Sequence, residues 1–344
     1  MRKSIPLLPV VLGFAAFVVL ILDSKTALQG GFEGVQMCLQ ALIPALFPFI
    51  FLCSWTSTKM CRVPLPFLLP IGKLCKLPKG GESTLLTGFL GGYPIGAQNV
   101  YQLWKSEILD TATAKRLLGF CSIAGPSFIF GVMGQLFSSA GICFLLWLTQ
   151  ILSAIFTGLL LPGSSPGSIL THGSKPISMS TALDNSIKAM VRICGWAVLF
   201  KIIISVLDRW VLWAVSDDLK VLFTGLFELS NGCLALGSVE GIGSQFVIAA
   251  ALLSFGGLCV YMQTCSVTKE LGAGSYLTGK LIQSLIATIL SILFLPAIDA
   301  SSQKEFFPLL IILALLLSAC IVFLHRKKII VAFSGKRLYN QPIR

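Results

Sequence analysis

The sequence predicts an all-α membrane protein, a polytopic bundle of transmembrane helices in which some helices are broken or re-enter the bilayer. Of the 344 residues, 55% are hydrophobic and only 12% are charged, about half the charged share of an ordinary soluble domain. Five stretches (4–22, 34–58, 117–174, 241–268 and 306–324) contain no Asp, Glu, Lys or Arg. Each comes close to or exceeds the roughly 20 apolar residues that a helix needs to cross a bilayer. Soluble enzymes and nucleic-acid binders are therefore largely excluded.

The basic residues predict how the chain is oriented in the cell membrane. The net charge is +12, and Arg2 and Lys3 precede the first apolar run, while further Lys and Arg residues crowd 59–82 and 326–344. By the positive-inside rule both termini and the 59–82 loop face the cytoplasm, which requires an even number of crossings. A secretory signal is the less favoured interpretation of the first run, because no small-residue cleavage site follows it.

Hydropathy divides the chain into ten apolar segments, in agreement with even parity. They are 5–22, 35–55, 84–104, 117–137, 140–161, 189–213, 221–238, 244–265, 276–296 and 307–324. We expect N-terminal transmembrane helices over 1–58, a cytoplasmic interfacial loop over 59–82, two similar units over 83–161 and 179–265, C-terminal transmembrane helices over 266–325 and a basic cytoplasmic tail over 326–344.

Three of these segments are not clean spans. The third holds four glycines and Pro94, the fourth holds Gly125-Pro126, and the seventh holds Glu228 and Asn231-Gly232. Broken backbone in a membrane is tolerated only where it faces protein or a wet cavity. We therefore expect broken or re-entrant helices at these three places.

The chain contains two pairs of segments that are similar in sequence pattern. Residues 88–94 are followed by 117–126, and 225–232 are followed by 252–259, each pair being a glycine-interrupted segment and then a Leu-Leu-x-Phe-like segment. Duplicated units with corresponding breaks point to the central site of a transporter, and chance similarity is the alternative. Ten simple spans place the third and seventh segments in the same orientation, so an inverted repeat requires one broken segment to re-enter.

Glu228 and Lys201 are the two charged residues that this reading leaves inside apolar segments. An acid at membrane depth normally faces the bundle interior or a water-filled path, so Glu228 is expected to act in ion coupling; a protonated, hydrogen-bonded packing role is the alternative. Lys201 either attracts an anion or snorkels to the interface, with Asp208 two turns away as its partner. Gly88, Gly92 and Gly96 form a small-residue stripe suited to close helix packing.

Polar and aromatic residues cluster around the breaks, where they suit recognition of a small polar molecule. The candidates for substrate contact are Tyr93, Pro94, Asn99, Ser122, Pro126, Ser127, Ser230, Asn231 and Gln263. Taken singly, such side chains are ordinary helix–helix hydrogen-bonding groups.

Enzyme chemistry and bound cofactors are not expected. The sequence contains no H-E-x-x-H motif, and His172 and His325 lie in a loop and at the start of the tail, so a general base or metal site is not evident. The eleven cysteines are scattered without a C-x-x-C pair and are most simply small hydrophobes. Because no P-loop is present, transport would be secondary, with a proton or a sodium ion as the coupling ion.

Residues 45–49, 88–97, 117–128, 225–232 and 254–263 together resemble the YlbJ-like sporulation integral membrane proteins, which contain the nucleoside-recognition (Gate) domain. The resemblance runs from about residue 35 to about residue 300, and the G-Y-P-x-G-A block at 92–97 is its most specific part. It implies Gate units like those of concentrative nucleoside transporters, and a role in moving dipicolinate, a small aromatic dicarboxylate, between the mother cell and the forespore.

We therefore expect a secondary transporter of a small polar, anionic aromatic metabolite, with the lipid bilayer and that substrate as partners. Whether the chain forms a homo-oligomer is left open by the sequence. The alternatives are a nucleoside transporter and a membrane scaffold for spore envelope assembly that transports nothing. A cavity between the two units favours transport, whereas breaks packed dry around a satisfied Glu228 favour the scaffold.

Overall fold

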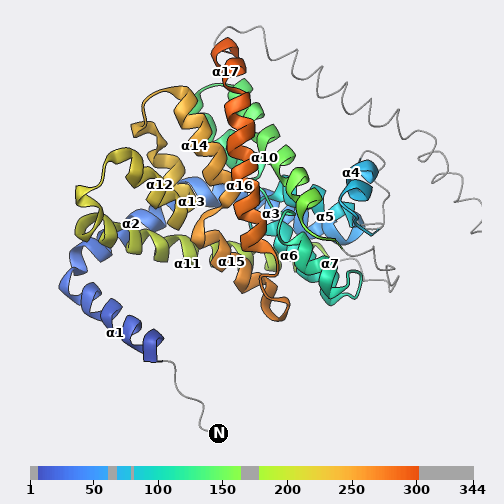
Figure 1. Ribbon diagram of the computed structural model, residues 1–344. Coiled ribbons are helices and arrows are strands. Elements are labelled where there is room, and N and C mark those ends of the chain that lie inside the picture. The colour runs from blue at the N-terminus through green and yellow to red at the C-terminus, as the bar shows by residue number, and fades with distance from the viewer. Residues whose placement is uncertain (1–6, 61–67, 79–80, 164–177, 302–344) are drawn as a thin grey trace, which may run out of the picture.

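The computed structural model describes residues 7–60, 68–78, 81–163 and 178–301 (Figure 1). Within these ranges the regular elements are helices, and no strand is present. The helices are α1 (Leu7–Leu22), α2 (Ser24–Met37), α3 (Ile43–Met60), α4 (Leu69–Leu74), α5 (Glu82–Gly91), α6 (Ile95–Lys105), α7 (Thr111–Leu117), α8 (Pro126–Phe128), α9 (Gly134–Phe137), α10 (Ala140–Leu160), α11 (Met179–Trp210), α12 (Asp217–Phe227), α13 (Leu229–Ala235), α14 (Ile242–Phe255), α15 (Gly257–Thr268), α16 (Tyr276–Leu293) and α17 (Leu295–Ser301). The predicted 307–324 segment, the 326–344 tail, both histidines and parts of the 59–82 loop lie outside the described residues.

Five helical stretches of the described chain are long and apolar enough to cross a membrane. They are Ser24–Thr56, Ala140–Leu160, Met179–Trp210, Ile242–Leu271 and Tyr276–Leu293, and two shorter apolar helices cover Gly13–Leu22 and Pro126–Phe137. The predicted 84–104, 117–137 and 221–238 segments are therefore not single spanning helices. Glycine, proline and the Glu228 cap divide them into shorter pieces.

The predicted 35–55 segment begins too late, because the helix starts at Ser24 and continues through a π-helical turn (Cys38–Leu42) into α3. Its first part, α2, packs antiparallel along α11, and α1 projects to one side of the bundle (Figure 1). Gly30 and Gly34 allow the close approach: a Cβ on Gly34 would lie 3.0 Å from the Cα of Val198. Small residues at four-residue spacing are a common basis for tight helix packing in membranes.

Helices are interrupted at the three places that the sequence predicts, and at a fourth that it does not. The breaks lie between α5 and α6 at Gly92–Pro94, along the non-helical stretch 118–125 before α8, and between α12 and α13 at Glu228. The unpredicted break separates α14 from α15 at Gly256-Gly257, where both glycines have positive φ angles of 84° and 77°. Such angles favour glycine over residues with a Cβ.

The breaks meet in two pairs. A Cβ on Gly92 would lie 2.8 Å from the backbone nitrogen of Gly125, so the α5–α6 break touches the end of the 118–125 stretch. A Cβ on Gly257 would lie 2.9 Å from the carbonyl oxygen of Gly225 and 3.4 Å from the nitrogen of Leu229, so the α14–α15 break touches the α12–α13 break. Interrupted helices therefore cross at their interruptions.

The predicted glycine stripe packs against both a helix and extended chain: α5 and α6 meet at Gly88 and Gly96, where a Cβ on Gly96 would lie 3.0 Å from the Cα of Gly88. A Cβ on Gly88 would overlap the carbonyl oxygen of Cys121, and a Cβ on Gly96 would overlap the Ser122 hydroxyl. Gly88 and Gly96 thus let the 118–125 stretch lie directly on the backbones of α5 and α6.

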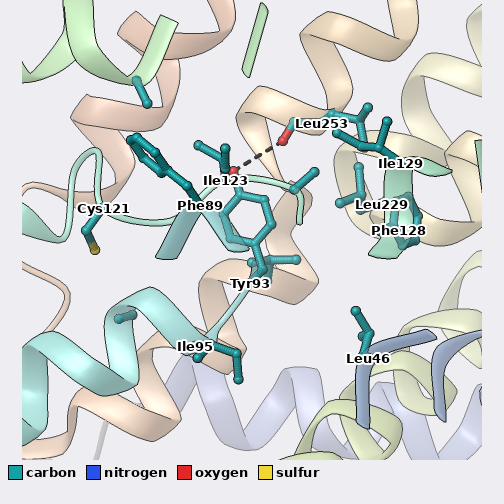
Figure 2. Close-up of a cluster of buried hydrophobic side chains, with 14 of the residues drawn as sticks. Leu46, Phe89, Tyr93, Ile95, Cys121, Ile123, Phe128, Ile129, Leu229 and Leu253 are labelled. Atoms are coloured by element: carbon teal, nitrogen blue, oxygen red, sulfur yellow. Dashed lines mark hydrogen bonds between the residues drawn. The ribbon is translucent and has the colours of Figure 1, made fainter. Parts of the chain in front are cut away.

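Tyr93 joins the two pairs of interrupted helices. Its hydroxyl is 3.2 Å from the carbonyl oxygens of both Leu253 and Ser254, at the end of α14. Figure 2 shows this ring among the buried side chains of Phe89, Ile123 and Leu253. The buried core of the protein thus lies where the two pairs meet.

Candidate functional site

A small inner cavity of about 40 Å³ lies where the two pairs of interrupted helices meet α3 and α11. The α5–α6 and 118–128 regions, α13 and α15 supply Tyr93, Gly125, Glu228, Ser230 and Gln263 to its lining, and Leu42, Leu46, Ile193 and Ala197 complete it. Four predicted site residues, Tyr93, Glu228, Ser230 and Gln263, therefore share one cavity. It has room for about one water molecule, at roughly 30 Å³ per water.

Glu228 is buried, with 3% of its surface exposed, and it caps the N-terminus of α13. One of its carboxylate oxygens accepts two hydrogen bonds from Asn231, one from the backbone nitrogen and one from the side-chain amide, both at 2.7 Å. A side-chain acceptor at the N-cap satisfies backbone donors that the first helical turn leaves free. The predicted acid at the break is thus held by its own helix.

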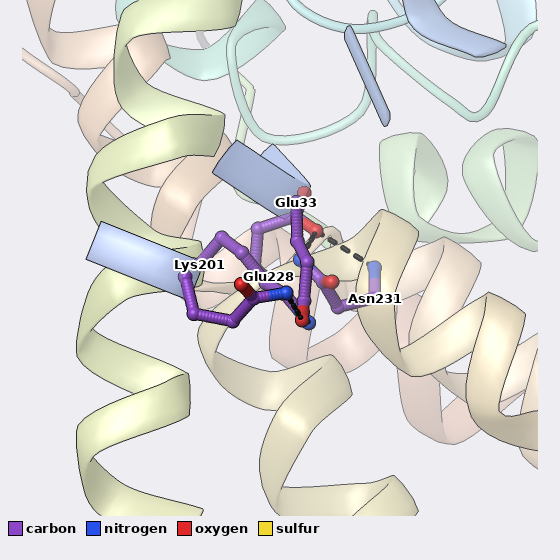
Figure 3. A network of polar contacts seen from close by, with 5 residues as sticks. Glu33, Lys201, Glu228 and Asn231 are labelled. Carbon is purple, nitrogen blue, oxygen red and sulfur yellow. Dashed lines mark hydrogen bonds and ion pairs between the residues drawn. The ribbon is translucent and has the colours of Figure 1, made fainter. Parts of the chain in front are cut away.

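Asn231 also lines a much larger cleft of about 890 Å³ on the far side of this bond. This outer cleft is bounded by α2, α11, α12 and α13, and its charged lining residues are Lys25, Glu33, Lys201, Asp208, Arg209 and Lys220. Figure 3 shows the Lys201–Glu33 pair and the Glu228–Asn231 pair in one view. The Glu228–Asn231 contact thus joins a residue of the outer cleft to a residue of the inner cavity.

The predicted partner of Lys201 is wrong. Lys201 Nζ lies 3.0 Å from a carboxylate oxygen of Glu33, whereas Asp208 pairs with Lys220 at 3.5 Å. The reason is the α2–α11 packing, which brings Glu33 across from Lys201. Lys201 therefore belongs to the outer cleft and not to the inner cavity.

The remaining predicted residues do not line the inner cavity; they are Pro94, Asn99, Ser122, Pro126 and Ser127. Pro126 and Ser127 are the first residues of α8 and lie between the lining residues Gly125 and Phe128. Asn99 donates to the Thr87 hydroxyl at 2.7 Å. Pro94 caps α6 after a cis peptide bond. The Ser127 hydroxyl is buried and makes no hydrogen bond within the described part of the chain.

Lys280 is the functional candidate that the sequence reasoning missed, so the expectation that only Glu228 and Lys201 lie inside apolar segments is wrong. Lys280 is the fifth residue of α16 and is fully buried. Its ammonium donates to the Ser122 carbonyl and, at 2.6 Å, to Oε1 of Gln283. It also lies 4.8 Å from the centre of the Tyr93 ring. A lone Lys within an apolar segment is the signal that was available.

Buried amides extend this polar region between α10, α14 and α16. The Ser254 hydroxyl donates to Gln150 Oε1 at 2.9 Å, and the amide of Gln150 donates to the Ala250 carbonyl at 3.2 Å. Gln283 reaches Ser153 at 3.4 Å. Hydrogen-bonded networks of this kind rigidify a core when their members are satisfied.

A polar anchor at Asp23, the residue before α2, fixes the start of that helix. The Trp210 indole donates to Asp23 at 2.8 Å, and Arg209 lies 3.3 Å from the same carboxylate. The hydrogen bond from Trp210 holds the pKa of Asp23 below its ordinary value, helped by Thr26 and by the charge of Arg209.

No protein-family model, curated protein or solved structure matches this chain. Among the described residues there is no group of three or more His, Cys, Asp or Glu side chains placed to hold a metal ion. The inner cavity does bring a carboxylate, a hydroxyl and an amide together beside helix breaks, a combination that can hold water or an ion and hydrogen-bond a small polar ligand.

Proposed function

We propose that this chain is a multi-pass secondary carrier for a small, polar, anionic aromatic metabolite. The observation that carries the proposal is the inner cavity where the two pairs of interrupted helices meet, with buried Glu228 in its wall. Transporter sites lie near the bilayer midplane, between repeat units, and are built from discontinuous helices. We propose that the two pairs belong to two Gate-like units of this kind.

The substrate would bind when the two pairs separate. A cavity of about 40 Å³ is far below the roughly 300–1,000 Å³ of typical small-molecule sites, so the described conformation corresponds to a closed carrier. The outer cleft, about 890 Å³, would then be the vestibule on one membrane face. Opening from that face would require the Glu228–Asn231 contact to move.

Within this carrier Glu228 would take up the coupling proton or sodium ion. Its carboxylate accepts two hydrogen bonds. Because an ionised carboxylate is negative and can only accept, it would bind a cation more readily than an anionic substrate. The N-termini of α6 and α15, which begin at breaks, would supply partial positive charge for substrate carboxylates. Tyr93, Ser230 and Gln263 would contact the substrate directly.

The family resemblance of residues 88–97 and 225–232 names dipicolinate as the substrate and sporulation as the setting. The same resemblance makes a nucleoside the main alternative substrate. We test both with the full chain in liposomes, loaded against labelled dipicolinate, uridine and an unrelated neutral sugar. Accumulation of dipicolinate alone supports the proposal. Accumulation of uridine alone would show that the substrate is a nucleoside and not dipicolinate.

A membrane scaffold is the second candidate, because one observation favours it. Glu228 is satisfied by Asn231, and a buried acid with its own partner is compatible with a purely structural role. Liposomes in which neither labelled compound accumulates, from protein that is folded and monodisperse, would favour the scaffold over the carrier.

A further inference from the structure

Lys280 is a buried basic side chain with no anionic partner among the residues that the structure describes. It exposes none of its surface. Its two hydrogen-bond partners, the Ser122 carbonyl and Gln283, are neutral. An uncompensated charge in a dry interior is costly, and ionisable residues at membrane depth usually mark substrate or ion paths.

The backbone is shaped to bring Lys280 to this place. A Cβ on the preceding residue, Gly279, would overlap the backbone of Gly119, so α16 lies directly on the 118–125 stretch. Only a residue without a side chain permits this contact. The contact places the Lys280 ammonium at the Ser122 carbonyl, beside the first pair of crossing breaks.

Two buried hydroxyls next to each other have no hydrogen-bond partner among the described residues apart from one another. They belong to Thr264 and Tyr276, which expose 0% and 1% of their surfaces. A Cβ on Gly256, the residue before α15, would lie 3.4 Å from the Tyr276 hydroxyl and 3.4 Å from Cζ of Tyr93. An unpaired buried hydroxyl costs free energy unless a ligand or water meets it.

Tyr93 connects this cluster to the inner cavity. Its ring faces the Lys280 ammonium at 4.8 Å and also lines the cavity, while the Tyr276 ring lies 5.7 Å from the same ammonium. A displacement of Tyr93 would therefore join Lys280 to the cavity. The rings would offer flat apolar walls to an aromatic ligand.

We propose that Lys280, with the hydroxyls of Tyr276 and Thr264, forms the binding site for a carboxylate group of the substrate. The carboxylate would replace the Ser122 carbonyl and Gln283 as the acceptor for the ammonium, and it would accept hydrogen bonds from these two hydroxyls. The ligand class is a small aromatic carboxylate. This inference rests on the proposed carrier function and names the residue that recognises its anionic group.

The test uses the full chain in detergent, with benzoate, chloride and neutral benzamide as probes. Unfolding is followed with a thiol-reactive dye, since seven of the nine described cysteines are buried. Benzoate is expected to raise the midpoint with increasing concentration, as a ligand of the folded state does. Equal shifts with chloride or with benzamide would overturn the carboxylate assignment.

Variants separate binding from folding. Lys280→Gln should lose the benzoate shift, Lys280→Arg should keep part of it, and the exposed Lys115→Gln control should keep all of it. Should Lys280→Gln fail to fold, Tyr276→Phe decides. Its hydroxyl has no hydrogen-bond partner among the described residues other than the adjacent Thr264 hydroxyl, so the midpoint without ligand should change little while benzoate affinity falls about 2- to 10-fold.

A folded Tyr276→Phe or Lys280→Gln protein with unchanged benzoate affinity would overturn the site. Transport is read separately in liposomes. Benzoate binding without transport would support the carboxylate site and contradict the carrier function. Dipicolinate transport at the same rate by Lys280→Gln and the wild type would support the carrier function and contradict the site.

Discussion

The backbone and side-chain nitrogens of Asn231 both donate to one carboxylate oxygen of Glu228, each at 2.7 Å. Asn231 lines the outer cleft and Glu228 lines the inner cavity, so this contact joins the walls of the two spaces. The same contact caps the N-terminus of α13, so a helix cap lies at the place where the proposed carrier would have to open.

Asn231→Ala removes one of the two donors and leaves the backbone donor in place. We expect the free energy of unfolding to fall by about 1.5 kcal/mol, the usual range for a hydrogen bond to a carboxylate. Thermal unfolding in detergent measures it, with half-buried Asn185→Ala on α11 as the control. Equal stability of Asn231→Ala and wild type would show that the side-chain bond does not hold α13.

Gly88→Ala should destabilise the protein strongly, because the new Cβ would overlap the backbone carbonyl of Cys121, which has no flexible side chain to yield. Overpacking of this kind costs about 1–3 kcal/mol. Gly195→Ala on α11 is the matched control, since nothing lies within 4 Å of its Cβ position, and it should be neutral or stabilising. Similar melting temperatures for the two variants would contradict the close crossing at Gly88.

Tyr93→Phe keeps the ring and removes the hydroxyl that bonds the end of α14. We expect a loss of about 1 kcal/mol, with the melting transition remaining cooperative. If the two pairs of interrupted helices must separate during transport, the weakened contact should also change the maximal uptake rate more than the KM. An unchanged melting temperature would mean that this hydrogen bond does not join the two pairs.

Acid should weaken the anchor at the start of α2. The pKa of Asp23 is lower in the folded protein than the ordinary value of 3.8, first because Trp210 donates to it. Its stabilising contribution is therefore complete above about pH 4 and is lost as the pH falls through the lowered folded pKa. Melting temperatures between about pH 5 and pH 3 should fall less steeply for Asp23→Asn than for wild type, while exposed Asp184→Asn should follow the wild type. Parallel profiles for wild type and Asp23→Asn would contradict this assignment.

The helix breaks were predictable because their signals are local. Gly92, Pro94, Gly125 and Glu228 each disfavour continuous helix or mark a cap within a few residues, and the structure interrupts its helices there. The break at Gly256-Gly257 was missed because it lies in a strongly apolar run without proline. Its positive φ angles are a property of the backbone that two adjacent glycines only permit.

The pairing of charged residues was not predictable from one segment at a time. Lys201 pairs with Glu33 only because Gly30 and Gly34 bring α2 against α11, a contact between residues far apart in the chain. Lys280 lies one turn from the start of its helix, where a lysine ordinarily extends toward the membrane surface. The Gly279–Gly119 contact, which buries it, appears only in three dimensions.

The most direct test of the carrier proposal is uptake by liposomes that contain the wild type, Glu228→Gln or the exposed control Glu107→Gln. The side-chain amide that Glu228→Gln introduces keeps an oxygen that can accept from the Asn231 backbone, so the cap on α13 should survive. We expect Glu228→Gln to lose most dipicolinate accumulation and its dependence on pH or sodium, while Glu107→Gln matches the wild type. A wild-type rate with unchanged ion dependence in Glu228→Gln would contradict the proposed role of Glu228.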